Sequence, residues 1–146
     1  MQLLKAMQIS ASGMSLDRMR LQIVAGNIAN ANSTRTPDNQ GPYRRRLMMI
    51  ETQPFDRVYQ DAIGHDDGPS VDIPQLVGIV QDTSPGPTIF DPGHPDADPN
   101  GYVTMPNVNI VEEMVDMMSA SRSYEANLNA LEASRDMALK ALEIGR

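Results

Sequence analysis

The chain has 146 residues, a net charge of −7 and no cysteine, which excludes disulfide bonds and thiolate metal sites. The acidic balance argues against nucleic acid as a partner. No stretch approaches the roughly 20 apolar residues that a membrane-spanning helix needs. The N-terminal apolar run is broken by Gln8, Ser10 and Ser12, so we expect no cleavable secretory signal.

The N-terminal segment carries an apolar stripe with helical spacing. Its positions are separated alternately by four and three residues, so they share one helix face. We expect a helix that ends near Asn30 or Asn32, because asparagine tolerates the left-handed conformation. Gly13 and Gly26 cost this helix about 1 kcal/mol each relative to alanine. The stripe consists of Met7, Ala11, Met14, Arg18, Leu21, Ala25 and Ile28.

Three asparagines, Asn27, Asn30 and Asn32, alternate with small residues at the end of this segment. Such side chains form hydrogen bonds with nearby backbone groups, which predicts a helix stop. The alternative is that they make polar contacts with a neighbouring subunit. The sequence leaves both interpretations open.

The middle of the chain contains all eleven prolines, from Pro37 to Pro106. We expect strands over residues 43–51, 76–80 and 102–105, with turns at 83–87 and 91–93 and a loop at 64–69. The chain has no tryptophan, and its only phenylalanines are Phe55 and Phe90, so the core of this segment must be small. A small β-rich domain over residues 33–108 fits this pattern.

The middle segment has one basic cluster, Arg44, Arg45 and Arg46. In a strand these side chains alternate between faces, which favours a solvated edge over a phosphate-binding patch.

Acidic and histidine side chains gather within and just after the turn at 91–93. They can be read as oxygen and imidazole ligands of a divalent cation. The interleaved prolines favour the other interpretation, a rigid turn whose carboxylates accept hydrogen bonds from backbone amides. We therefore expect no metal, no cofactor and no catalytic residue. The residues concerned are Asp91, His94, Asp96 and Asp98.

The C-terminal segment, 109–146, predicts a long helix. Asn109 is a suitable N-cap, Glu112 closes a capping box, and Gly145 is a plausible C-cap. A seven-residue repeat over more than four heptads favours a left-handed coiled coil. A helix of this length spans about 54 Å, more than a compact domain of this size covers. The stripe consists of Ile110, Met114, Met117, Ser121, Tyr124, Leu128, Leu131, Arg135, Ala138 and Leu142.

Several of these motifs resemble a known family, the bacterial flagellar basal-body rod and hook proteins, and within it the proximal-rod members. The resemblance covers nearly the whole chain; it is weakest over residues 61–74 and at the turn 85–87. The matching motifs are Ala11-Ser12-Gly13-Met14, Asn27-Ile28-Ala29-Asn30-Ala31-Asn32, Tyr43-Arg44-Arg45, Asp91-Pro92-Gly93-His94-Pro95-Asp96-Ala97-Asp98, Gly101-Tyr102-Val103, Pro106-Asn107-Val108-Asn109, Glu112-Glu113-Met114, Ser123-Tyr124-Glu125-Ala126-Asn127 and Leu142-Glu143-Ile144-Gly145-Arg146.

The resemblance implies an α+β fold in which N-terminal (1–32) and C-terminal (109–146) helices pair as a coiled coil beside a β-rich middle domain (33–108). It implies a non-enzymatic subunit of a hollow, torque-transmitting periplasmic rod with an export lumen, needed for motility. Such proteins are exported through the flagellar type III apparatus without a cleaved signal.

The expected partners are other rod proteins, copies of the chain itself, and membrane-ring and export-gate components at the rod base, with no nucleic acid and no small-molecule substrate. A helical-hairpin adaptor and a metal-dependent hydrolase are the rival hypotheses. The residues expected at the assembly interface are Met7, Met14, Leu21, Asn27, Ile28, Asn30, Asn32, Ile110, Met114, Met117, Tyr124, Leu128, Leu131 and Leu142.

Overall fold

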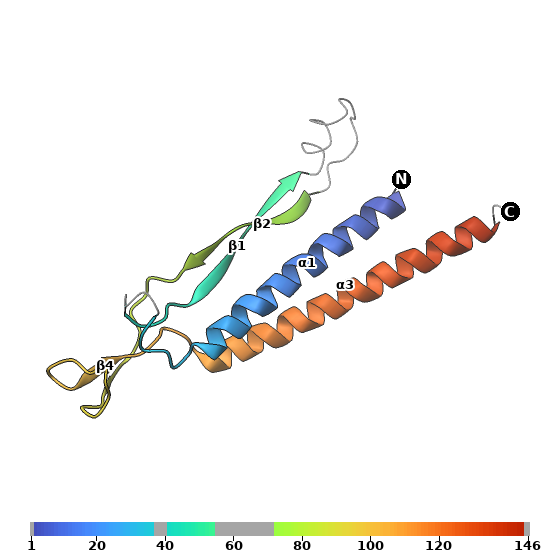
Figure 1. The fold of residues 1–146 in the computed structure, drawn as a ribbon. Helices are drawn as coiled ribbons and strands as arrows, with labels where there is room; N and C mark the ends of the chain where they lie inside the picture. The colour runs from blue at the N-terminus through green and yellow to red at the C-terminus, as the bar shows by residue number, and fades with distance from the viewer. Residues whose placement is uncertain (1, 37–40, 55–71, 145–146) are drawn as a thin grey trace. The chain divides into compact units, whose positions relative to one another are not determined.

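The computed structural model describes residues 2–36, 41–54 and 72–144. Strand β1 pairs with β2, and β3 pairs with β4, each in a two-stranded sheet. Two long helices and a small β region make the fold α+β, as the sequence predicts. No helix in the described part is long and apolar enough to cross a membrane. In chain order (Figure 1) the elements are α1 (Gln2–Ala29), β1 (Arg46–Pro54), β2 (Asp72–Gln81), β3 (Thr88–Phe90), β4 (Tyr102–Thr104) and α3 (Ile110–Ile144).

The chain divides into two compact units, each of which holds a stretch of α1 and a stretch of α3. Unit 1 contains Met1–Met19, Met49–Gly78 and Ala120–Arg146. Unit 2 contains Arg20–Met48 and Ile79–Ser119. Most of the contacts that bear on function lie in unit 2.

In unit 1, α1 approaches α3 closely at Gly13. A Cβ atom on Gly13 would lie 2.8 Å from Nδ2 of Asn127, which is too close for an ordinary contact. The same Nδ2 donates to Oδ2 of Asp17 over 3.0 Å. The glycine that weakens the helix in isolation therefore leaves room for the Asn127 amide to lie against α1 at this point.

The core of unit 2 combines a few apolar side chains with two polar ones. Val24, Ala31 and Val103 are buried. Among the described residues, the largest fully buried side chains belong to Asn27 and Glu113. A core this small and this polar depends on satisfied hydrogen bonds as much as on apolar burial.

The two sheets differ in how well the sequence predicts them. The strand expected at 76–80 lies within β2, which begins earlier, at Asp72, and includes Pro74. The strand expected at 102–105 matches β4 to within one residue. Strand β3 escapes prediction because it has only three residues between two turns. The strand expected from residue 43 begins at Arg46. The reason is that the backbone before it is bonded elsewhere: the Tyr43 amide donates to the Ser33 carbonyl over 3.0 Å. The loop predicted at 64–69 and Phe55 lie outside the described residues.

Both helix boundaries near the middle region are formed by asparagine. At the end of α1, Nδ2 of Asn30 donates to the Gly26 carbonyl over 2.8 Å, which is the helix stop predicted for this cluster. At the start of α3, Oδ1 of Asn109 accepts the Val111 amide over 3.1 Å, which confirms Asn109 as the N-cap. The predicted C-cap, Gly145, lies outside the described residues.

One row of α3 positions, spaced seven residues apart, is buried or half-buried although it contains no large apolar side chain. We call it the enclosed row. Its members are small or polar: Glu113, Ala120 and Ser134 are buried, and Asn127 is half-buried. Small side chains in a repeated row allow helices to approach closely. The row of larger residues beside it is less enclosed and ends in the exposed Leu142.

Candidate assembly site

A buried polar network in unit 2 joins the end of α1 to the first turns of α3. Its centre is the side-chain amide of Asn27, which makes four hydrogen bonds. Nδ2 donates to Oε2 of Glu113 and to the Arg46 carbonyl, each over 3.0 Å. Oδ1 accepts the Tyr43 hydroxyl and the Arg46 amide, also over 3.0 Å each. The amide is therefore fully used within the chain.

Arg45 supplies the charge that Glu113 needs inside the protein. Its Nε lies 2.6 Å from Oε1 of Glu113, and one of its terminal nitrogens lies 3.5 Å from Asp116. Burial lowers the pKa of Arg45, but its hydrogen bond and charge pairing with Glu113 and the nearby Asp116 and Glu112 outweigh burial and raise that pKa. Arg20 of α1 adds a weaker pair with Asp116 at 3.6 Å.

Asn107 holds the segment before β1 against the connection that follows β2. Its Oδ1 accepts the Arg45 amide over 2.8 Å. Its Nδ2 donates to the carbonyls of Asp82 and Ser84 over 3.2 and 3.1 Å. The Arg45 guanidinium is thus held in place by its own backbone as well as by its carboxylate partners.

Tyr43 closes the network on the side of the middle region. Burial is the main cause that raises the pKa of its hydroxyl; the charge of Arg46 opposes the shift and that of Glu113 adds to it. The Arg46 guanidinium lies over the Tyr43 ring, with its Cζ 5.6 Å from the ring centroid. Tyr43 therefore remains a neutral hydrogen-bond donor at physiological pH.

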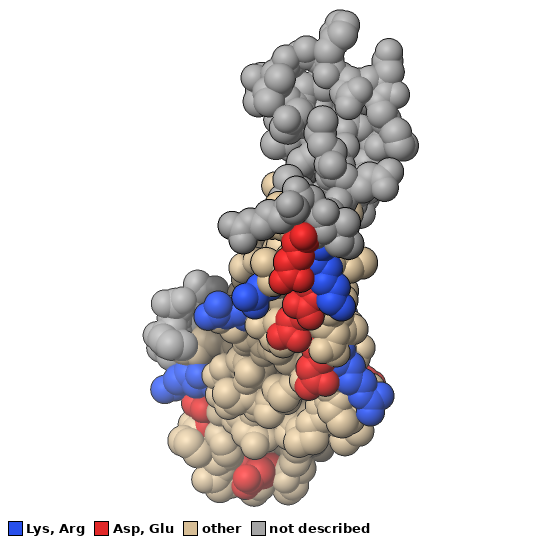
Figure 2. Space-filling view, turned by 90° about the vertical axis from the view of Figure 1, so that its right-hand side faces the viewer, with Lys and Arg blue, Asp and Glu red and all other residues tan. Residues whose placement is uncertain are grey.

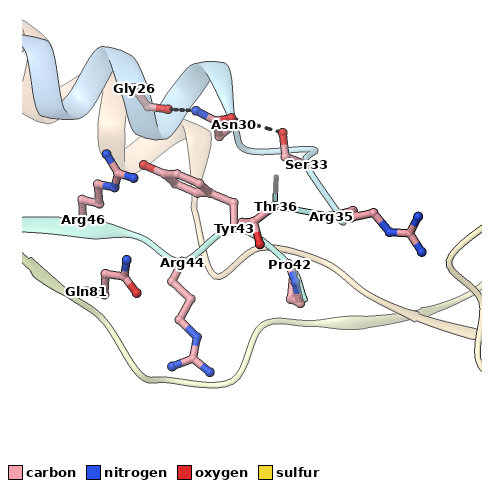
Figure 3. A pocket seen from close by; sticks show the side chains of 10 residues that line it. All are labelled: Gly26, Asn30, Ser33, Arg35, Thr36, Pro42, Tyr43, Arg44, Arg46 and Gln81. Atoms are coloured by element: carbon pink, nitrogen blue, oxygen red, sulfur yellow. Dashed lines mark hydrogen bonds between the residues drawn. The ribbon is translucent and has the colours of Figure 1, made fainter. Parts of the chain in front are cut away.

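Beside Tyr43 lies a cavity of about 520 Å³ that we call the arginine cavity (Figure 3). Three of its lining side chains are cationic, and the figure shows them pointing in different directions around Tyr43. The lining residues are Gly26, Asn30, Ser33, Arg35, Thr36, Pro42, Tyr43, Arg44, Arg46 and Gln81.

The acidic turn after β3 is built as a capped turn. Oδ1 of Asp91 accepts the Gly93 amide over 3.1 Å, and Nδ1 of His94 accepts the Asp96 amide over 3.1 Å. The Asp96 carboxylate accepts the Thr34 hydroxyl over 2.9 Å. These contacts support the turn interpretation, and the described residues contain no group of three potential ligands placed to hold a metal ion.

The first turns of α3 present an exposed apolar surface, which we call the α3 apolar face. Val111, Met114, Val115 and Met118 are spaced at i, i+3, i+4 and i+7 and share one side of the helix. All four are more than half exposed, and Val111 reaches 69%. An apolar surface of this kind on one side of a helix is typical of a protein–protein contact.

The predicted interface residues are distributed over buried, half-buried and exposed positions. Asn27 is buried and bonded within the chain, so its place in an assembly interface stays a prediction. Half-buried positions are Met7, Met14, Leu21, Ile28, Asn30, Met117, Tyr124 and Leu131. Exposed positions are Asn32, Ile110, Met114, Leu128 and Leu142.

Sequence reasoning misses the network partners of Asn27. The prediction of a solvated edge for the basic cluster describes the exposed Arg44 and Arg46 but not Arg45. From the sequence, Glu113 is only one more acidic residue in the first turn of a helix. One signal in the sequence could have pointed to the network. The middle segment has a single basic cluster with a tyrosine beside it, and the C-terminal helix begins with a cluster of acidic residues.

Comparisons with known proteins place these features in one class. The family described as "Flagella basal body rod protein" matches residues 7–35, and "Flagellar basal body rod FlgEFG protein C-terminal" matches residues 100–144. The two matches cover most of α1 and the whole of α3, the helices that the network joins. They define a structural protein of the flagellar rod class.

Full-length relatives narrow the class. The chain is 38% identical to the flagellar basal-body rod protein FlgC of Borreliella burgdorferi over 99% of this chain and 98% of the relative. It is 38% identical to FlgC of Salmonella typhimurium over 100% of both chains, and 35% identical to FlgC of Bacillus subtilis over 97% of both. The chain belongs to the FlgC family of flagellar basal-body rod proteins. Proteins of this family are structural subunits and not enzymes.

Proposed function

We propose that this chain is a subunit of the proximal rod and assembles there through its terminal helices with copies of itself and with other rod proteins. The observation that carries the proposal is the α3 apolar face, which lies exposed next to a buried network that fixes the start of the helix. Burial of apolar surface contributes roughly 25 cal/mol per Å². Four exposed apolar side chains therefore supply a contact that repeats with every added subunit.

The fixed helix start supports assembly because it removes part of the ordering cost of binding. Asn27, Arg45 and Glu113 hold the first turns of α3 before any partner arrives. Figure 2 shows one face of the molecule on which wide areas carry no charged side chain. The carboxylates and basic groups that border these areas lie next to each other. Such a surface suits tight contact with neighbours, with charges setting the register.

The remaining parts of the proposal follow from membership of the family. The rod would be a hollow periplasmic shaft that transmits torque and leaves a lumen for exported subunits, and its base would contact membrane-ring and export-gate components. A contact between different surfaces of identical subunits builds a helical filament where the rotation between subunits does not close into a ring, which is the geometry a shaft needs. The proposed export route is the flagellar type III apparatus, without a cleaved signal.

The test is an aspartate in the α3 apolar face. The test uses flagellated cells in which this chain is the only FlgC-family protein. In such cells Met114→Asp should prevent rod assembly, because a carboxylate would be buried without a partner. The measurement is the number of basal bodies with intact rods by electron microscopy, together with swimming. Ser123→Asp, at an exposed position on another side of the same helix, is the matched control and should assemble normally. Intact rods with Met114→Asp would reject the proposal.

A further inference from the structure

The arginine cavity offers several separated positive charges. Arg35 is paired with Asp96 at 3.2 Å, and Arg46 lies over the Tyr43 ring. Within the described residues, neither Arg44 nor Arg46 forms an ion pair. Because the three guanidinium groups point in different directions (Figure 3), a single small anion can meet only one of them. A segment that carries several carboxylates fits this arrangement better.

The acidic turn after β3 is such a segment in the described part of the chain. Glu113 and Asp116 at the start of α3 are already paired with arginines of their own chain. From Val58 to Ser121 the sequence has no lysine or arginine, so the turn has no basic residue near it along the chain. Asp91 and Asp98 on this turn are exposed. Arg44 and Arg46 are also exposed, so both sets of charges are open to a partner.

The acidic turn is already ordered in the single chain. The Asp98 amide donates to the Tyr102 carbonyl, and the Gly101 amide donates to the Asp98 carbonyl, each over 2.8 Å. Gly101 adopts a φ of 81°, which favours glycine, and the missing Cβ lets the Phe90 ring lie against it. A turn held in this way loses little conformational freedom when it binds.

One contact within the chain shows that these two surfaces suit each other. Asp96 on the turn pairs with Arg35 at the border of the cavity and also accepts the Thr34 hydroxyl. That pairing uses Asp96 and Arg35, and it leaves Asp91, Asp98, Arg44 and Arg46 for a contact between molecules.

We propose that the arginine cavity of one copy of this chain receives the acidic turn of a second copy, with Asp91 and Asp98 pairing with Arg44 and Arg46. The contact uses different surfaces on the two copies, so it can add further copies instead of stopping at a closed dimer. The inference rests on the proposed function and adds to it the partner and the polarity of one contact. Because the pairs are solvent-accessible, they set orientation and register more than affinity.

The absence of cysteine allows a direct test by cross-linking. Full-length Arg44→Cys and Asp98→Cys proteins are mixed at high concentration and treated with a short bismaleimide. We expect several-fold more cross-linked heterodimer than from Arg44→Cys mixed with Asp136→Cys, which carries its cysteine at an exposed acidic position on α3. Equal yields would overturn the inference. A higher yield with Asp136→Cys would make α3 the occupant and would also overturn it.

Charge reversal gives a second measurement. The double variant Arg44→Glu/Arg46→Glu should weaken self-association in sedimentation by about fivefold at low salt. Mixing it with Asp98→Arg, which leaves the hydrogen bond between Asp91 and the Gly93 amide intact, should restore part of the association. If Arg44→Glu/Arg46→Glu associates as the unmodified chain does while Met114→Asp fails to assemble, this inference falls and the proposed function stands. If both variants behave as the unmodified chain does, both proposals fall.

Discussion

Asn27 donates from its side-chain amide to Oε2 of Glu113 over 3.0 Å, and each of the two residues is only 1% exposed. The contact joins the last turns of α1 to the first turn of α3, 86 positions apart in the sequence. A buried carboxylate needs such partners, because an unpaired one is strongly destabilising. The relative placement of these two helix ends is therefore set by polar groups rather than by a large apolar core.

Asn27→Ala should lower the free energy of unfolding by about 3 kcal/mol, because it leaves the Tyr43 hydroxyl and one Glu113 oxygen short of buried partners. Urea unfolding of the full chain measures the loss. Asn32→Ala is the matched control: Asn32 is exposed, so its replacement should change stability by less than about 0.5 kcal/mol. Equal losses for the two variants would contradict a central role for the Asn27 amide.

Glu113→Gln keeps the size of the side chain but removes the charge that faces Arg45. We expect a loss of about 2 kcal/mol, because the partly buried Arg45–Glu113 hydrogen bond loses its ionic acceptor and Arg45 retains only Asp116 as an ion-pair partner. Glu112→Gln, at the exposed neighbouring position, should have almost no effect. Thermal unfolding of the two variants compares them directly. A larger effect at Glu112 would refute the assignment of Glu113 as the ionic partner of Arg45.

The hydrogen bonds of Asp82 predict how the stability of the fold changes in acid. Its carboxylate accepts the Ser84 hydroxyl over 2.6 Å and the Ser84 amide over 2.9 Å, and these bonds lower its pKa. Because the folded pKa lies below the unfolded one, Asp82 contributes stability above the unfolded pKa of about 3.9. That contribution is lost as the pH falls through the folded pKa.

The serine hydroxyl is the larger cause of the Asp82 shift. Ser84→Ala should therefore raise the pKa of Asp82 toward its ordinary value, which carboxyl-detected NMR titration measures. Thr83→Ala is the control, since the described contacts of Asp82 do not include Thr83. An unchanged Asp82 titration in Ser84→Ala would mean that the hydroxyl does not stabilise the charged carboxylate.

The helices and their boundaries could be predicted from the sequence because the signals for them are local. Apolar spacing indicates both helices, and Asn109 and Asn30 occupy the helix boundaries expected of them. Short-range hydrogen bonding of this kind depends only on neighbouring residues.

The buried network could not be predicted in the same way. Arg45 and Glu113 are 68 positions apart, and neither has a sequence neighbour that marks it as buried. The enclosed row of α3 is hidden for a second reason: Ala120 and Ser134 do not register in a search for large apolar side chains. Their role depends on how closely a second helix approaches, which is a tertiary property.

The two glycines of α1 should respond in opposite directions to alanine. Beyond the backbone of its own helix, no atom of the described residues lies within 4 Å of the place that a Cβ would take at Gly26. Gly26→Ala should therefore stabilise the chain by about 0.5 to 1 kcal/mol through helix propensity. At Gly13 the added methyl would meet Asn127 and displace it from Asp17. Gly13→Ala should destabilise by about 1 kcal/mol despite the same gain in propensity.

A double-mutant cycle isolates the cause at Gly13. In the Asn127→Ala background the added methyl has room, so Gly13→Ala should become stabilising by about 1 kcal/mol. Urea unfolding of the four proteins gives the coupling free energy between the two positions. If Gly13→Ala destabilises equally in both backgrounds, the close approach to Asn127 is not what requires glycine at this position.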